Sequence, residues 1–370
     1  MFDDSVDRSD SSTEQWNESN FDFWNRIAGP VADRVRDRID VWCSNYPSDK
    51  FARFKKEACN PKNDFHAYFY ELFWHEFWRL RGVNPCVEVA LTGGSVPEFL
   101  LPFKEGKCVF EATVCYDETN NPSGKKKRFD QVCDRLNRLD CNCVIDIHRF
   151  KEKTKDNPQP KRIAASIEKQ LTAFIRCDSS QQELSYMDER VEIKYTAHRC
   201  DRADGQRITR ILPARWMQNR PEEALKKQLR DKSNQHDVGD SSYLIAADAQ
   251  GAWLRDDNVW TKALFGDTET NEETVHRKRN GFFGSESGPK RQHVSGVIRT
   301  CLDPTNVARA ELCLFHNPFC HNPFAPEYWP MRQIMLVDGN VNITPAKESL
   351  SAVMELPGDW PGGGLFDHVR

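Results

Sequence analysis

Two glutamates stand on a predicted β-hairpin, in a pattern that suggests metal chemistry. Glu98 lies in residues 96–101 and Glu111 in residues 109–114, and both segments are rich in branched and aromatic apolar residues, which favour strands. The polar, glycine-bearing residues 104–107 between them suit a tight turn. Two carboxylates close together in apolar strands repel each other and are costly to bury. A hard divalent cation such as Mg²⁺, which takes oxygen ligands at about 2.0–2.1 Å, would offset both effects.

A third acid, Glu71, lies in the middle of a segment that is predicted to be a buried helix. Asp64 is a suitable N-cap and Gly82 a suitable end, and residues 65–81 between them are apolar on almost every side. A carboxylate in such a helix either pairs with a nearby arginine or lysine, or points at a charged site.

The elements that must position these acids alternate along the chain, which predicts an α/β core with a mixed sheet. Further helices are predicted at residues 125–139, 161–176 and 221–236, and further strands at 86–91, 143–150, 191–196, 242–247, 294–298 and 310–315. We expect a disordered acidic tail at residues 1–20, an N-terminal helical element at 21–61, a core at 62–250 and a C-terminal extension with strands and loops at 251–370.

Composition excludes a membrane protein and leaves room for a substantial core. The 370 residues are 38% hydrophobic, and no apolar run approaches the roughly 20 residues that a membrane span requires. The first residues lack the order of a secretory signal, so we expect a cytoplasmic protein, and the 13 cysteines fit reduced thiols. The net charge of −4 is small, but basic clusters such as residues 125–128 and 277–279 could form phosphate-facing patches.

The order of these acids resembles the PD-(D/E)xK nuclease superfamily, which has the restriction-endonuclease-like fold. The resemblance covers about residues 62–250 and rests on the helix bearing Glu71, on Pro97-Glu98 and on Glu111-Ala112-Thr113. More particularly, residues 263–266, 280–284, 294–297 and 316–318 are similar to those of a group of largely uncharacterised bacterial proteins assigned to that superfamily.

The resemblance implies a metal-dependent nuclease with a restriction-endonuclease-like mixed sheet flanked by helices. Glu98 and Glu111 would hold one or two Mg²⁺ or Mn²⁺ ions, and Glu71 would reach the same site directly or through water. Such a metal lowers the pKa of a bound water and stabilises charge on a phosphodiester oxygen. DNA is the expected substrate in preference to RNA, with a role in antiviral defence or DNA processing. A homodimer or an operon partner protein is left open.

Two positions depart from the superfamily pattern. Glu98 stands where aspartate is usual, and Thr113 stands where lysine is usual. A threonine hydroxyl can orient a water molecule but supplies no positive charge. Relocated lysines occur in this superfamily, and Lys232, on the helix before the strand at 242–247, is the first candidate for the missing cation. Lys227 is the second candidate.

Other interpretations of the sequence remain open. Glu192-Ile193-Lys194 spells the acid-x-lysine pattern on another predicted strand, although no Pro-Asp hairpin precedes it and an exposed strand face explains it equally well. Thr113 and the small net charge favour a catalytically silent nucleic-acid-binding or scaffold protein on the same fold. A third alternative is an unrelated α/β protein whose acids are structural.

Overall fold

Two separate hydrophobic cores divide the chain into two units. The first unit comprises Met1–Asp4, Pro30–Thr119 and Asn219–Asp367, and the second comprises Ser5–Gly29, Asn120–Gln218 and His368–Arg370. The structure is a computed structural model, and it describes residues 1–3, 5–15, 18–104, 106–116, 123–154, 156–177, 179–200, 208–211, 221–250, 253–271, 274–278, 280–285 and 288–365.

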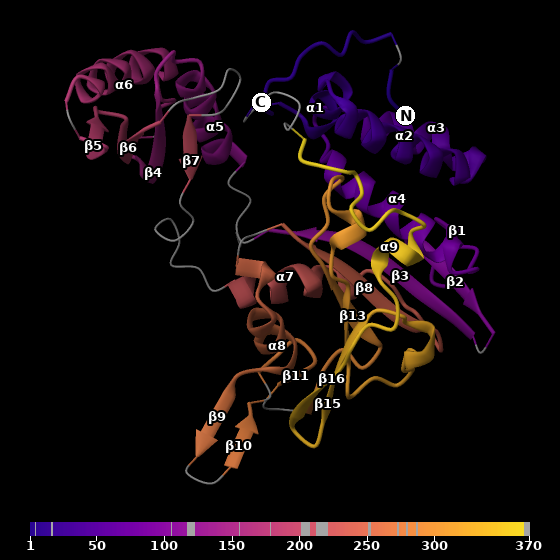
Figure 1. Ribbon diagram of the computed structural model, residues 1–370. Coiled ribbons are helices and arrows are strands. Elements are labelled where there is room, and N and C mark those ends of the chain that lie inside the picture. The colour runs from indigo at the N-terminus through magenta and orange to yellow at the C-terminus, as the bar shows by residue number, and fades with distance from the viewer. Residues whose placement is uncertain are drawn as a thin grey trace. The chain divides into compact units, whose positions relative to one another are not determined.

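A mixed eight-stranded sheet forms the centre of the first unit (Figure 1). Its strand order is β1-β2-β3-β8-β13-β14-β15-β16, in which β3, β8 and β13 run parallel and most other neighbours are antiparallel. The strands are β1 (Cys86–Val87), β2 (Phe99–Phe103), β3 (Gly106–Cys115), β8 (Ser242–Ala249), β13 (Gly296–Thr300), β14 (Cys313–His316), β15 (Arg332–Val337) and β16 (Asn340–Thr344).

Helices cover both faces of this sheet. On one face lies α4 (Phe65–Leu80), which begins where the Asp64 carboxylate accepts a hydrogen bond from the His66 amide at 3.0 Å. Its aromatic side chains pack on the sheet, and the rings of Trp74 and Phe110 lie 4.9 Å apart. On the other face, α7 (Pro221–Ser233) and α8 (Asp257–Phe265) share a core with residues of β3 and β8 such as Ile245. The sheet is therefore buried at its centre.

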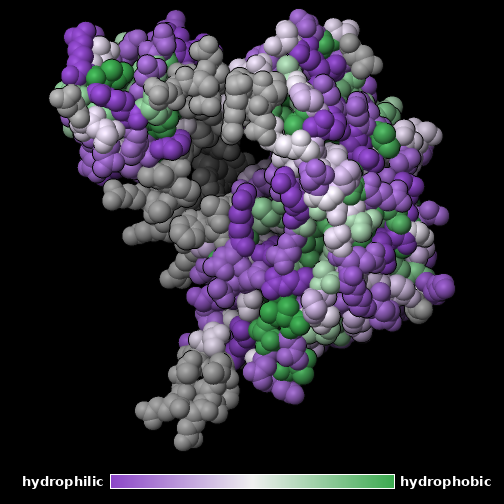
Figure 2. Space-filling view, in the orientation of Figure 1, coloured by the Kyte–Doolittle hydropathy of each residue, from purple (hydrophilic) through white to green (hydrophobic). Residues whose placement is uncertain are grey.

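Shorter elements complete the first unit. The helices α2 (Pro30–Asn45) and α3 (Ser48–Ala58) contact α4. Figure 2 shows a hydrophobic area over the β15–β16 hairpin, where Val337 and Ile343 are exposed. The remaining elements are η2 (Trp253–Arg255), β9 (Thr268–Asn271), β10 (Thr274–Arg277), β11 (Gly284–Ser285), β12 (Gly288–Pro289), η3 (Val307–Arg309), η4 (Pro326–Tyr328) and α9 (Leu350–Val353).

The second unit has its own four-stranded sheet, in the order β5-β6-β4-β7. Antiparallel pairs join β5 (Gln181–Met187) to β6 (Val191–Arg199) and β6 to β4 (Cys143–Glu152), while β7 (Thr209–Ile211) runs parallel to β4. The helices α5 (Ser123–Asn137) and α6 (Pro160–Ile175) pack against one face of this sheet, and α1 (Asn20–Arg26) belongs to the same unit. Apolar residues on alternate positions of β4 and β6 point to the helices.

Two boundaries differ from those expected from the sequence. The core predicted at residues 62–250 is interrupted by the second unit, and the strands of the predicted C-terminal extension, β13 to β16, continue the same sheet as β3 and β8. Within residues 1–20, for which a disordered tail was expected, the described residues make contacts with other parts of the chain. Phe2 is buried against Phe65, and the guanidinium of Arg26 ion pairs with acids of the tail, which offsets their mutual repulsion.

Within the described ranges, no helix combines the length and the apolar character needed to cross a bilayer.

Candidate active site

The hairpin of β2 and β3 ties the two predicted acids to each other's backbone. Phe99 pairs with Phe110 across the hairpin, so Glu98, just before β2, lies directly opposite Glu111. The Glu98 amide donates a hydrogen bond to Glu111 Oε1 at 3.1 Å, and the Ala112 amide donates to Glu98 Oε2. Because each carboxylate is held by the opposite strand, both point to the same place.

Lys232, at the end of α7, lies between these carboxylates. Its Nζ is 3.1 Å from Glu98 Oε1 and 2.7 Å from Glu111 Oε2. The Tyr243 hydroxyl donates a hydrogen bond to the Lys232 carbonyl at 3.0 Å and so fixes the end of the helix against β8. The Glu111 side chain is 3% exposed, whereas those of Lys232 and Glu98 are 20% and 26% exposed. The cluster therefore reaches solvent on the side of Glu98.

The electrostatics of the cluster keep Lys232 charged. Burial acts to lower the pKa of Lys232, but the carboxylates of Glu98 and Glu111 outweigh it and raise this pKa above its ordinary value. Partial burial raises the pKa of Glu98, and the positive charge of Lys232 opposes this increase. A permanently protonated lysine can stabilise negative charge but cannot accept a proton.

His236 also holds Glu111, and the sequence reasoning missed it. Its Nε2 lies 2.7 Å from Glu111 Oε1, and its side chain is 5% exposed. Beyond Ser233, the last residue of α7, the chain turns, and the Gln235 amide donates to the Lys232 carbonyl at 3.1 Å. The available signal was the spacing of four residues between Lys232 and His236, which places two side chains on one face of a helix or the turn that ends it.

Glu71 approaches the cluster from the face of the sheet that α4 covers. It lines a cavity of about 450 Å³ together with Glu98 and Thr113. The Tyr46 hydroxyl donates a hydrogen bond to Glu71 Oε1 at 2.6 Å. Burial raises the pKa of Glu71 to about 7, against the effect of this hydrogen bond. Glu71 is thus held by a tyrosine, while the neighbouring Arg79 pairs with Glu76.

The structure brings the predicted residues together in two overlapping groups. Lys232 joins Glu98 to Glu111, and the cavity joins Glu98 to Glu71 and Thr113. The rival motif has a different environment, in the second unit, where Lys194 and Glu192 form an ion pair of 3.6 Å on β6.

The donor atoms present fit a hard divalent cation. Glu98 Oε1 and Glu111 Oε2 both face the Lys232 ammonium, so they already converge on a single positive charge. Carboxylate oxygens are the ligands that Mg²⁺ and Mn²⁺ prefer. Among the residues that the structure describes, no group of three or more His, Cys, Asp or Glu side chains is gathered as a metal site. A metal here would therefore rest on Glu98 and Glu111, with Glu71 across the cavity.

No family model, no curated protein and no solved structure matches this chain.

Proposed function

We propose that this chain is a metal-dependent nuclease of the restriction-endonuclease-like fold, which hydrolyses phosphodiester bonds and prefers DNA to RNA. The observation that carries the proposal is the contact of Lys232 with both Glu98 and Glu111. Two acids on a hairpin and one lysine are the residues that the resemblance to the PD-(D/E)xK superfamily implies. Antiviral defence or DNA processing is the corresponding cellular role.

Each residue of the cluster has a part in this proposal. Glu98 and Glu111 would hold Mg²⁺ or Mn²⁺, with Glu71 reaching it directly or through water, and the bound metal would supply an activated water and charge stabilisation. Lys232 remains protonated, so it would stabilise the negative charge that develops on the phosphoryl oxygens rather than act as a base. His236 and the Glu98 amide orient the Glu111 carboxylate.

Cleavage of plasmid and single-stranded DNA with Mg²⁺ or Mn²⁺ tests the proposal. We expect cleavage by the wild-type protein and a loss of at least about 100-fold in Glu111→Ala, because a metal ligand is removed. Glu327→Ala, at an exposed position of η4, is the matched control and keeps wild-type activity. Equal cleavage by the wild type and Glu111→Ala would contradict the proposal.

A catalytically silent nucleic-acid-binding or scaffold protein on the same fold is the second candidate. The position of Lys232 favours this silent protein, because the lysine ammonium neutralises Glu98 and Glu111 without a metal. Thr113 also supplies no charge. Titration calorimetry with Mg²⁺ and Mn²⁺ separates the two candidates. A nuclease takes up metal in the wild type and loses it in Glu98→Gln/Glu111→Gln, whereas a silent protein shows neither metal uptake nor cleavage.

A further inference from the structure

A basic surface on the second unit is not used by the site described above. Residues 120–218, which make up most of the second unit, contain 21 Lys and Arg against 14 Asp and Glu, a net charge of +7 in a chain whose total is −4; with Ser5–Gly29 and His368–Arg370 the whole unit carries +5. The chain outside residues 120–218 is therefore acidic, at −11. Such an asymmetry attracts a polyanion to one part of a protein. Parts of the predicted basic clusters lie outside the described part of the chain. These parts are the side chains of residues 125–127 and the whole of residue 279.

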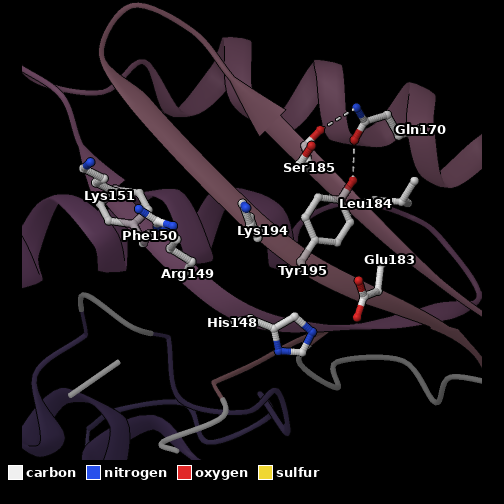
Figure 3. Close-up of a pocket in the computed structure, with 10 residues that line it drawn as sticks. All are labelled: His148, Arg149, Phe150, Lys151, Gln170, Glu183, Leu184, Ser185, Lys194 and Tyr195. Atoms are coloured by element: carbon white, nitrogen blue, oxygen red, sulfur yellow. Dashed lines mark hydrogen bonds between the residues drawn. The ribbon is translucent and has the colours of Figure 1, made fainter. Parts of the chain in front are cut away.

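The face of the four-stranded sheet opposite α5 and α6 is polar. On β6, Ile193 and Tyr195 point into the core with the helices, so Glu192, Lys194 and Thr196 point to the other face. In Figure 3 the Tyr195 hydroxyl turns to Gln170 of α6, at 2.5 Å, while Lys194 extends from the strand beside it. We call this face, with the neighbouring residues of β4 and β5, the open face.

A β-bulge in β4 brings further basic side chains to the open face. Ile147 pairs with Tyr195 and Arg149 pairs with Lys194, so His148 is an extra residue in the strand. His148 Nε2 lies 2.5 Å from Thr196 Oγ1, and Arg149 reaches Glu192. Both side chains are thus on the open face, although they are consecutive in sequence, as bulges permit. A regular strand would have sent one of them into the core.

Two cations of the open face project further than the acid that they share, although Glu183 of β5 is an exposed acid on the same face. The side chains of Arg149 and Lys194 are 48% and 54% exposed, whereas Glu192, which they share, is 17% exposed. Their ion pairs with Glu192 are loose, at 3.8 Å and 3.6 Å. Exposed pairs of this kind contribute little stability, so both cations are free to exchange Glu192 for another anion.

A cavity of about 960 Å³ lies at this place (Figure 3), and Arg149, Lys151 and Lys194 contribute to its lining. We propose that the open face of the second unit binds the phosphate backbone of DNA through Arg149, Lys151 and Lys194. The identity of the ligand rests on the proposed nuclease function, since the face itself specifies only a polyanion. Contacts to phosphates position a nucleic acid without reading its sequence.

Fluorescence anisotropy with labelled single-stranded and duplex DNA in EDTA tests the proposal, because cleavage is then suppressed. We expect wild-type binding that weakens steeply with salt. In Arg149→Gln/Lys194→Gln the affinity falls by roughly tenfold, and the slope of log K against log salt falls by about 0.9 for each duplex phosphate that the variant no longer neutralises. Lys151→Gln, a single change at an exposed position, gives a smaller change in the same direction.

The matched control is Lys161→Gln/Lys169→Gln, which removes the same charge from exposed positions of α6 on the other side of the sheet. It keeps the wild-type affinity and salt slope. Equal effects of the two double variants, or a wild type that does not bind DNA in EDTA, would overturn the proposal. A wild type that binds DNA in EDTA but does not cleave it with Mg²⁺ or Mn²⁺ refutes the nuclease and leaves the DNA-binding face standing.

Discussion

At the scale of single residues, the candidate site depends on one lysine that the local pattern does not contain. Thr113 stands where the resemblance to the PD-(D/E)xK superfamily would lead one to expect a lysine, and Lys232 reaches Glu98 and Glu111 from a helix far along the chain. The two acids could be predicted from the sequence, because a carboxylate among the apolar residues of a strand is costly to bury unless a cation or a hydrogen bond compensates its charge. Lys232 could be selected only as one of two candidates, because the direction of a helical side chain depends on how the helix packs.

Removal of the Lys232 charge leaves two carboxylates facing each other. In Lys232→Met we expect the free energy of unfolding to fall by about 1–3 kcal/mol near neutral pH, because the acids lose their shared cation. Lys232 opposes the increase that burial causes in the pKa of Glu98, so its removal raises that pKa further. A carboxyl with a raised folded-state pKa stabilises the fold at low pH and loses this contribution as the pH rises.

The deficit of Lys232→Met is therefore smaller at about pH 5 than at about pH 8. Urea denaturation of the wild type and the variant at both pH values measures it. Glu98→Gln/Lys232→Met is the control, since it removes one acid with the cation and recovers part of the lost stability. A deficit of the same size at both pH values would mean that lost packing of the lysine stem, rather than charge, is responsible.

At the scale of elements, local patterns predicted most helices and strands but not their partners. The apolar periodicity predicted the positions of α4, of the hairpin of β2 and β3, and of β8. The parallel pairing of β3 with β8 and of β8 with β13 joins segments far apart in sequence. Nothing in a strand's own residues specifies such a partner, because branched apolar side chains fit against any similar strand. The end of α7 at Ser233 was also missed, and His236 with it.

One glycine in the segment after α8 shows how closely elements approach in the first unit. A Cβ at Gly281 would lie 2.4 Å from the Leu264 carbonyl oxygen and 2.6 Å from the Gly266 nitrogen, both backbone atoms of the helix end. The Phe282 amide also donates to the Ala263 carbonyl at 2.7 Å, so this segment cannot move away freely. In Gly281→Ala we expect a loss of about 1–3 kcal/mol in the free energy of unfolding.

Gly358→Ala is the matched control for Gly281→Ala, because a Cβ there meets no atom within 4 Å. Its melting temperature stays at the wild-type value or rises slightly, since alanine reduces the freedom of the unfolded chain. Differential scanning fluorimetry of both variants makes the comparison. Equal melting temperatures would mean that the end of α8 can shift to admit a methyl group.

At the scale of the whole molecule, the sequence did not reveal that a second unit is inserted into the first. The strands and helices of residues 120–218 have the same apolar character as those around them, so no change in apolar content marks the boundary. The difference lies in charge, which is +7 for this stretch and −11 for the rest. Charge does not determine fold, but it affects which partners a surface attracts. The net charge summed in a window along the sequence could have indicated this second unit.

Because each unit has its own hydrophobic core, we expect the two units to unfold in separate steps. Ile167 is fully buried in the core of the second unit, and Ile245 is fully buried in that of the first. Seven of the ten tryptophans belong to the first unit, so tryptophan fluorescence reports mainly on that unit. Ile167→Ala therefore destabilises one step of the urea unfolding followed by far-UV circular dichroism, by about 2–5 kcal/mol, and leaves the fluorescence midpoint unchanged. Ile245→Ala shifts the fluorescence midpoint. If Ile167→Ala moves both signals together, the two cores unfold as one cooperative unit.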